Sequence, residues 1–163
     1  MPLTDVAPIE ASIEIAAPPA QVWELVSDLS NMSRWSPQVF KTFVRGGETR
    51  QGAKMININR KGLLVWPTQA MVTTFEPGQK IAFRIRENWT IWSFTLGPTA
   101  DGGTRIVQRR EAPKGISDVS VRLTKAVLGG VDDFTADLVK GMNQTLARIK
   151  TDAERDVAAG SAA

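Results

Sequence analysis

The sequence predicts an α+β fold in which a curved antiparallel sheet of about seven strands wraps around one long C-terminal helix. Apolar residues recur at three- and four-residue steps over about residues 131–155, which is the periodicity of an amphipathic helix. Short runs with alternating apolar residues, separated by turn signals, occupy residues 39–112 and are typical of an antiparallel meander. Between the first predicted strand and this meander, the sequence favours two short helices.

The N-terminal part of the fold is predicted from one strand pattern and two proline signals. Apolar and polar residues alternate in part over residues 9–16, which predicts the first strand. Pro18-Pro19 ends that strand and suits the first turn of a helix, and apolar residues follow at helical spacing. A second short helix is predicted over residues 31–35, with Ser30 as its cap. It ends at Ser36-Pro37, because a residue before proline is pushed away from helical angles.

The middle of the chain is predicted to be strands joined by tight turns. Gly46-Gly47, Glu76-Pro77-Gly78-Gln79 and Asp101-Gly102-Gly103 are turn signals of the kind that connect antiparallel strands. The predicted strands are residues 39–45, 54–61, 67–75, 81–86, 88–96 and 104–111.

The C-terminal part is predicted to be helical. Residues 119–128 favour a short helix, and Gly129-Gly130 breaks it before the long helix over residues 131–155. At ~1.5 Å per residue, a helix of this length spans roughly 35–40 Å and can cross a small sheet. Its predicted core face is Val131, Phe134, Leu138, Met142, Leu146 and Ile149.

Chain length and composition predict one globular domain over residues 9–155, between a flexible N-terminus at 1–8 and a frayed tail at 156–163. The chain has 163 residues, 42% of them hydrophobic, and a formal net charge of +3. Its basic residues are scattered over alternating strand positions, which favours a solvated surface over nucleic-acid binding. No apolar run reaches ~18 residues, so no integral membrane segment is expected, and the predicted location is the cytoplasm.

Three residue types are missing, and their absence narrows the chemistry. The chain contains no Cys, no His and no Tyr. A Ser-His-Asp or Cys-His triad, a disulfide framework and a zinc site with His or Cys ligands are therefore excluded. The sequence also lacks a clustered acidic motif of the calcium-loop kind. We therefore assign no catalytic residue, no metal site and no cofactor from the sequence.

Several short motifs resemble those of a known superfamily. The strand before Pro18-Pro19, then Trp35-Ser36-Pro37, Asn59-Arg60-Lys61-Gly62 and Phe75-Glu76-Pro77-Gly78, occur in the order and spacing of START-like, helix-grip (SRPBCC) proteins. The resemblance covers residues 9–154 and is greatest to small stand-alone bacterial members labelled polyketide cyclase/dehydrase-like. It implies the helix-grip fold, with a deep and mostly apolar cavity between the sheet and the long helix.

Strand alternation together with this resemblance predicts which side chains line the cavity. The candidate ligand-binding residues are Trp35, Met55, Asn57, Asn59, Phe83, Trp92, Phe94, Phe134, Leu138 and Met142. Trp35 is expected near the mouth, and the last three form the helix wall. On the fourth strand two alternatives stay open: either Met71 and Thr73 or Ala70 and Val72 point inward. The same apolar residues would also suit a solid core without a cavity.

The polar candidates are few. Asn57 and Asn59 are expected to point inward and to bond either a ligand or the neighbouring strands, because an unpaired buried amide costs about 1–3 kcal/mol. Family members that act as aromatases or cyclases are thought to use an Arg and a Tyr in the cavity. This chain has no Tyr. Gln108 and Arg110, which share parity with inward positions, are the remaining candidates. Gln38 stands where related sequences often have an acidic residue.

The sequence therefore favours a module that binds a small hydrophobic molecule, such as a lipid, a quinone or a polyketide-like metabolite. An enzyme of the polyketide cyclase, aromatase or dehydratase type, acting in the same cavity, is the alternative. A protein-interaction module with a collapsed cavity is a second alternative. Binding is preferred because the residues that usually perform acid–base chemistry at neutral pH are absent.

Overall fold

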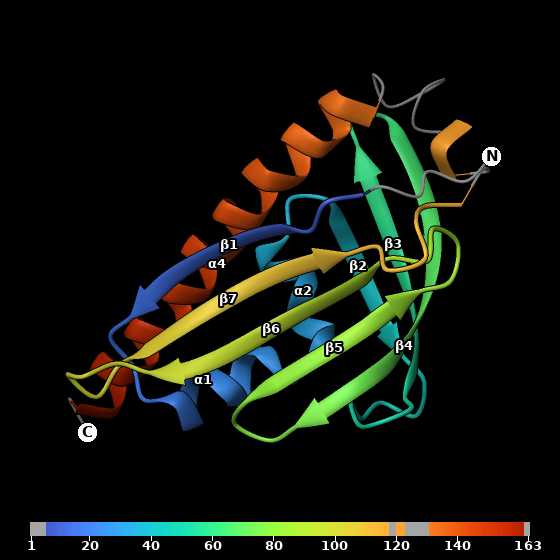
Figure 1. Ribbon diagram of the computed structural model, residues 1–163. Helices are drawn as coiled ribbons and strands as arrows, with labels where there is room; N and C mark the ends of the chain where they lie inside the picture. Colours follow the sequence, from blue (N-terminus) through green and yellow to red (C-terminus); the bar gives the residue numbers. More distant parts are fainter. Residues whose placement is uncertain (1–5, 118–119, 123–130, 162–163) are drawn as a thin grey trace.

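The computed structural model describes residues 6–117, 120–122 and 131–161, and within the last helix the side chains of residues 135–160. The helix predicted over residues 119–128 lies largely outside these residues, as does most of the predicted N-terminal segment. A curved sheet faces one long helix, and the short helices lie on the same side of the sheet as that helix (Figure 1).

Seven antiparallel strands form the sheet in the order β1-β7-β6-β5-β4-β3-β2. This order confirms the predicted antiparallel meander, and it also pairs the first strand with the last. In that pair, Ile9 lies opposite Arg110 and Ile15 lies opposite Thr104. The strands are β1 (Ile9–Ile15), β2 (Val39–Val44), β3 (Lys54–Lys61), β4 (Leu64–Glu76), β5 (Lys80–Ile85), β6 (Ile91–Pro98) and β7 (Thr104–Glu111).

The helical segment between β1 and β2 follows the prediction except at its cap. Helix α1 spans Pro19–Val26 and begins with the second proline of the pair. The predicted second helix divides into a 3-10 turn, η1 (Leu29–Asn31), and a short helix, α2 (Met32–Trp35). The predicted cap, Ser30, is wrong: the Asp28 carboxylate caps the turn by accepting the Ser30 N–H at 3.1 Å. Asp28 therefore uses its side chain to satisfy a free N–H at a helix start.

Strand β4 is longer than the sequence predicts and contains a proline. It begins at Leu64, ahead of Pro67, which the pattern places first in the strand. Pro67 pairs with Ile58 of β3, whereas pairing with β5 begins only at Ala70. One side of β4 therefore has no ladder partner at Pro67, so a residue without an N–H fits there.

Strand β6 starts later than predicted because the residues before it form a turn. Trp89 has a φ of 67°, in the left-handed region that few residues other than glycine adopt. The Asn88 carboxamide oxygen accepts the Thr90 N–H at 3.0 Å and the Thr90 hydroxyl at 2.7 Å. Such side-chain bonds compete with strand pairing, and the ladder with β5 begins at Ile91.

Helix α4 spans Val131–Ser161 and continues beyond the predicted end at Arg155. The predicted frayed tail is therefore corrected, since residues 156–161 are helical. Val157 packs partly buried against the core, which favours the helical state of these last turns. The predicted core face is confirmed where its side chains are described: Leu138, Met142, Leu146 and Ile149 are all buried.

Two polar contacts attach α4 to the edge strand β1. The Lys150 ammonium donates to the Glu14 carbonyl at 2.9 Å, and the Glu154 carboxylate accepts the Ala16 N–H at 2.9 Å. Lys150 and Glu154 also pair with each other at 2.6 Å. Because β1 has a strand partner only on its β7 side, these contacts satisfy backbone groups at its open edge.

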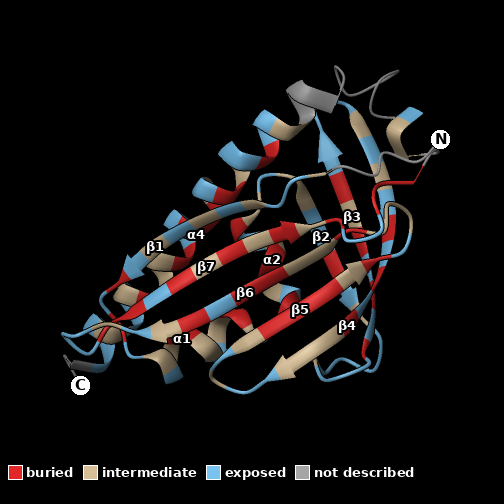
Figure 2. Ribbon diagram, in the orientation of Figure 1, coloured by how far each residue is buried: buried red, intermediate tan, exposed pale blue. Residues whose placement is uncertain are grey.

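The concave face of the sheet and the inner face of α4 form the core (Figure 2). Ala70 and Val72 of β4 are buried, whereas Met71 is 43% exposed, which resolves the open parity of this strand. The inward parity predicted for β3 and β5 is confirmed, since Met55, Asn57, Asn59, Phe83 and Ile85 are all buried. Among the described helices, none is long and apolar enough to cross a membrane.

Candidate functional site

A cavity of about 80 Å³ lies between the concave face of the sheet and α4. Apolar side chains contribute most of its surface, and polar groups from β3, β6 and β7 reach it from two sides. Its described lining residues are Met32, Ser36, Pro37, Gln38, Val39, Asn57, Asn59, Phe83, Ile85, Trp92, Gln108, Asp137, Leu138, Gly141, Met142 and Thr145.

The mouth of the cavity lies between the α2–β2 loop and the first turns of α4. Pro37 and Gly141 line both the cavity and an adjoining surface groove of about 730 Å³. A Cβ on Gly141 would lie 3.4 Å from Cγ of Pro37, so the proline ring lies close to the helix backbone at Gly141. At the rim, an ion pair of 2.7 Å between Lys61 and Asp137 connects the end of β3 to α4. A molecule entering the cavity from this groove would pass beside these residues.

The β3 wall of the cavity carries two amides, each partly satisfied by its neighbours. Asn57 accepts the Thr42 hydroxyl at 2.8 Å. The Asn59 amide nitrogen donates to the Thr68 hydroxyl at 3.0 Å and to the Trp66 carbonyl at 3.2 Å. Of the two alternatives left by the sequence, bonding to the neighbouring strands is therefore observed. These bonds orient the amides and leave the Asn57 amide nitrogen and the Asn59 oxygen without a partner among the described residues.

The opposite wall, from β6 and β7, carries polar atoms without partners. The Trp92 indole nitrogen and the Gln108 side-chain oxygen are buried and have no hydrogen-bond partner among the described residues. Both residues line the cavity. A buried polar atom without a partner costs about 1–3 kcal/mol, so two of them on one wall are a feature that needs a reason.

Arg110 lies on the same face of the sheet and is also buried. It is directly opposite Trp92 in the β6–β7 ladder and only 7% exposed. Among the described residues, no carboxylate or other acceptor contacts its guanidinium. Burial alone lowers the pKa of Arg110 to about 10, so the side chain remains a cation at neutral pH. The sequence had marked Arg110 and Gln108 only as candidates for inward positions, and both point inward.

The structure distributes the ten predicted lining residues over three groups. Phe134 lies outside the residues whose side chains are described. Trp35, Met55 and Phe94 are buried in the core and do not line the cavity. The remaining six line it: Asn57, Asn59, Phe83, Trp92, Leu138 and Met142.

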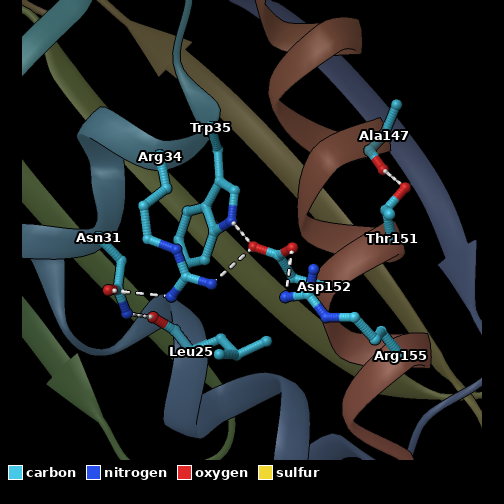
Figure 3. Close-up of polar contacts among 8 residues, drawn as sticks. All are labelled: Leu25, Asn31, Arg34, Trp35, Ala147, Thr151, Asp152 and Arg155. Atoms are coloured by element: carbon cyan, nitrogen blue, oxygen red, sulfur yellow. Dashed lines mark hydrogen bonds and ion pairs between the residues drawn. The ribbon is translucent and has the colours of Figure 1, made fainter. Parts of the chain in front are cut away.

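Trp35 was expected near the mouth, and the structure corrects this. Its ring is 1% exposed, and its indole N–H donates to the Asp152 carboxylate at 2.8 Å (Figure 3). Arg34 forms an ion pair with the same carboxylate at 2.9 Å. Trp35 therefore anchors α2 to α4. Sequence reasoning had no access to this contact, because the partner lies on a helix far away in the chain.

Sequence reasoning missed the residues at the mouth and on the polar face of α4. Pro37 was interpreted as the end of α2 and as part of a family motif, and Asp137 was not among the predicted site residues. Gly141 interrupts the apolar stripe of the helix, and a glycine inside a helix pattern is a signal of close packing. That signal was available in the sequence, although it does not identify the partner.

The arrangement suits binding and orientation of a ligand more than proton transfer. Among the described residues, no cluster of acidic side chains gathers in a way that would hold a metal ion. Inside the cavity the polar groups are amides, an indole N–H and hydroxyls, which donate and accept hydrogen bonds at neutral pH without changing charge. The Asp137 carboxylate also lines the cavity, at its rim, where it pairs with Lys61, and a guanidinium lies on the same face of the sheet.

Comparison with known proteins shows where this architecture recurs. A family described as polyketide cyclase/dehydrase and lipid transport matches residues 7–154. No curated protein sequence matches the chain. Similar solved structures include an aromatase/cyclase from a Streptomyces species, with 17% identity, a TM-score of 0.70 and coverage of 93% of this chain and 95% of that chain.

Two further solved structures are similar to this chain over most of its length. A polyketide cyclase-like protein from Corynebacterium glutamicum shares 22% identity at a TM-score of 0.63, over 92% of this chain and 93% of its own. The di-domain ARO/CYC protein StfQ of the steffimycin biosynthetic pathway shares 15% identity at a TM-score of 0.71, over 93% of this chain. This chain covers 51% of StfQ and so spans about half of its length. At these identities the likeness concerns the fold.

Proposed function

Because the chain belongs to the family of polyketide cyclases, dehydrases and lipid-transport proteins, we propose that it binds a small, largely apolar molecule between the sheet and α4. One observation carries the proposal: a cavity with a mostly apolar lining also presents polar atoms that have no hydrogen-bond partner in the described part of the chain. Apolar burial at about 25 cal/mol per Å² would supply affinity, and the polar atoms would fix orientation.

The size of the cavity limits how a ligand is held. About 80 Å³ is smaller than the ~150 Å³ of an apolar cavity that holds benzene. The enclosed space therefore takes only a slender part of a ligand, such as a segment of alkyl chain. The rest would lie in the adjoining groove between Pro37 and Gly141.

A second function in the same cavity is a cyclase-type reaction on a polyketide. The observation that favours it is the unpaired Trp92 N–H beside the cation of Arg110, since both polarise a carbonyl oxygen. Binding without turnover is preferred because the chain has no His, Cys or Tyr, and burial leaves Arg110 a cation at neutral pH. Incubation with a poly-β-keto thioester analogue distinguishes the two, since cyclised product would establish catalysis.

Two measurements test the proposed function. Denaturing extraction of the purified protein followed by mass spectrometry should release an apolar small molecule. Calorimetric titration with decanol, decanamide and decanoate should detect binding of at least one. If nothing is released and none of the three binds at millimolar concentration, the proposed function is wrong.

A matched pair of variants tests whether the ligand binds in the cavity. Val39 lines the cavity at its mouth, whereas Val65 is 58% exposed on the outer face of β4. Val39→Phe should weaken binding at least about tenfold, because the ring occupies the space a ligand needs, and Val65→Phe should leave it unchanged. Equal binding by both variants would place the ligand elsewhere.

A further inference from the structure

Strand β7 places three consecutive charged side chains in two different environments. Arg109 and Glu111 lie on the outer face, where Arg109 pairs with Glu111 at 2.8 Å and with Glu10 of β1 at 3.0 Å. Arg110 lies between them and points to the concave face, where it is buried. The outer arginine thus has two carboxylates, and the inner one has none among the described residues.

A guanidinium in this position is unfavourable unless something pairs with it. Removing a cation from water costs several kcal/mol, and the folded protein normally compensates with a carboxylate or with several acceptors. The lowered pKa of Arg110 reflects this cost, because burial is its only cause. The described part of the fold therefore keeps a cation on the concave side of the sheet, with no partner there that would stabilise it.

The neighbours of Arg110 add hydrogen-bonding groups on the same wall. Trp92 is its direct partner across the ladder, and residues opposite each other in an antiparallel pair have Cβ atoms about 4.5–5.5 Å apart. Gln108 lies two residues back along β7 and therefore on the same face. Trp92 and Gln108 both line the cavity, and each has a buried polar atom without a partner among the described residues. The cavity wall thus offers an N–H donor and an amide oxygen, and the cation of Arg110, which is not itself a described lining residue, lies beside them on the same face of the sheet.

We propose that this β6–β7 wall is a subsite for the acidic end of the ligand, and that the ligand is an amphipathic carboxylic acid. Arg110 and the Trp92 N–H would hold the carboxylate, while Phe83 and Leu138 contact the apolar part. The guanidinium fork matches the planar carboxylate, and charge-assisted bonds of this kind are the strong ones. The inference rests on the proposed function, because it takes the same cavity as the binding site.

The β3 wall would take a different part of the ligand. Asn57 and Asn59 are neutral, and each already bonds a neighbouring strand. Among the described residues, the Asn57 amide nitrogen and the Asn59 amide oxygen have no partner. These neutral atoms suit a carbonyl or a hydroxyl rather than an anion. Charge therefore assigns the acidic end of the ligand to β7 and neutral polar groups to β3.

Matched ligands test the subsite by calorimetry. Decanoate and decanamide have the same shape and differ in charge, so the ratio of their affinities isolates the anion. The wild-type protein should bind decanoate at least about tenfold more tightly than decanamide. Arg110→Met should abolish this preference while still binding decanamide. Arg109→Met, one residue away on the outer face, should retain it.

The outcomes separate this inference from the proposed function. Equal affinity for decanoate and decanamide would overturn the acidic subsite and leave the binding module intact. Failure of all ligands, decanol included, would overturn the proposed function itself. If Arg110→Met does not fold, carbon NMR of labelled decanoate bound to the wild-type protein decides the question. Its carboxyl pKa should fall below the value in free solution, and an unchanged or raised pKa would contradict a contact with Arg110.

Discussion

The indole N–H of Trp35 and the carboxylate of Asp152 form a hydrogen bond of 2.8 Å that joins α2 to α4 (Figure 3). The same carboxylate accepts from Arg34 at 2.9 Å and from Arg155 at 3.0 Å. Asp152 thus connects the helices on one side of the cavity, and its side chain is only 16% exposed. The position of α4 over the sheet depends on this contact in addition to apolar packing.

Substitution of Asp152 by alanine should therefore destabilise the protein. The variant leaves a fully buried indole N–H unpaired and removes an ion pair, so we expect the free energy of unfolding to fall by about 2–3 kcal/mol. Urea unfolding followed by circular dichroism measures it. Arg155→Ala is the control, because its side chain is 63% exposed and an exposed ion pair contributes about 0–1 kcal/mol. Equal midpoints for the two variants would contradict a structural role for Asp152.

Substitution by phenylalanine should change the free energy of unfolding differently at the two tryptophans with buried indole nitrogens. Trp35→Phe removes a bonded N–H and should cost about 1–3 kcal/mol, because the Asp152 carboxylate loses a partner. Trp92→Phe removes an N–H that has no partner, so the stability of the ligand-free protein should change by less than about 1 kcal/mol. Urea midpoints of the delipidated proteins compare them. Losses of the same size would mean that the Trp92 N–H is bonded in solution.

Gly141 should control access to the cavity. Alanine at this position should stabilise α4 by up to about 1 kcal/mol through helix propensity, because its methyl group reaches Pro37 only at contact distance. Leucine adds atoms that have no room beside Pro37 and should slow ligand association. Thermal unfolding measures the first effect, and stopped-flow tryptophan fluorescence measures the second. Unchanged association with Gly141→Leu would show that ligands enter by another route.

The contact of Glu154 with β1 should make stability depend on pH. The Lys150 ammonium, and then the Ala16 N–H, lower the pKa of Glu154 below its ordinary value of 4.5. A carboxyl whose pKa is lowered by folding stabilises the protein above its unfolded pKa, and this contribution is lost as pH falls through the folded value.

We therefore expect Glu154→Gln to be less stable than the wild type at pH 7, with the difference shrinking toward about pH 3. Urea unfolding of both proteins at several pH values measures this difference directly, because the other carboxyl groups titrate in both. A difference that stays constant over this range would show that the charge of Glu154 does not contribute.

Alternation together with the family resemblance predicted the inward faces of β3 and β5, because a strand places every second side chain on the same side. On β4 the sequence left two alternatives open, and burial in the assembled sheet selects Ala70 and Val72. The register with β5 also shifts between Val72 and Thr74, so a count of residues from one end does not carry through the strand. The cap at Asp28 was missed for a similar reason, since Ser30 and Asp28 are both good caps and the backbone decides between them.

The cavity was harder to predict than the fold. Trp35, Met55 and Phe94 are residue types that often line ligand-binding cavities. In this structure, side chains from other parts of the chain pack against them, so they belong to the core. Conversely, strand parity offered Gln108 and Arg110 only as candidates for inward positions, although buried polar residues normally have partners. The missing partners are visible only when all strands are assembled. The local pattern therefore identifies what is buried, and the assembled structure identifies what is unsatisfied.

The pairing of β1 with β7 has a consequence for the synthesis of the protein. Residues near position 10 leave the ribosome early, but their strand partner lies near position 110, and α4 follows still later. Until then the first strand has no neighbour, and contacts of such wide sequence separation form slowly. Until residues near position 110 have been made, the growing chain thus exposes an unpaired apolar strand, and chaperones would be expected to hold it during this period.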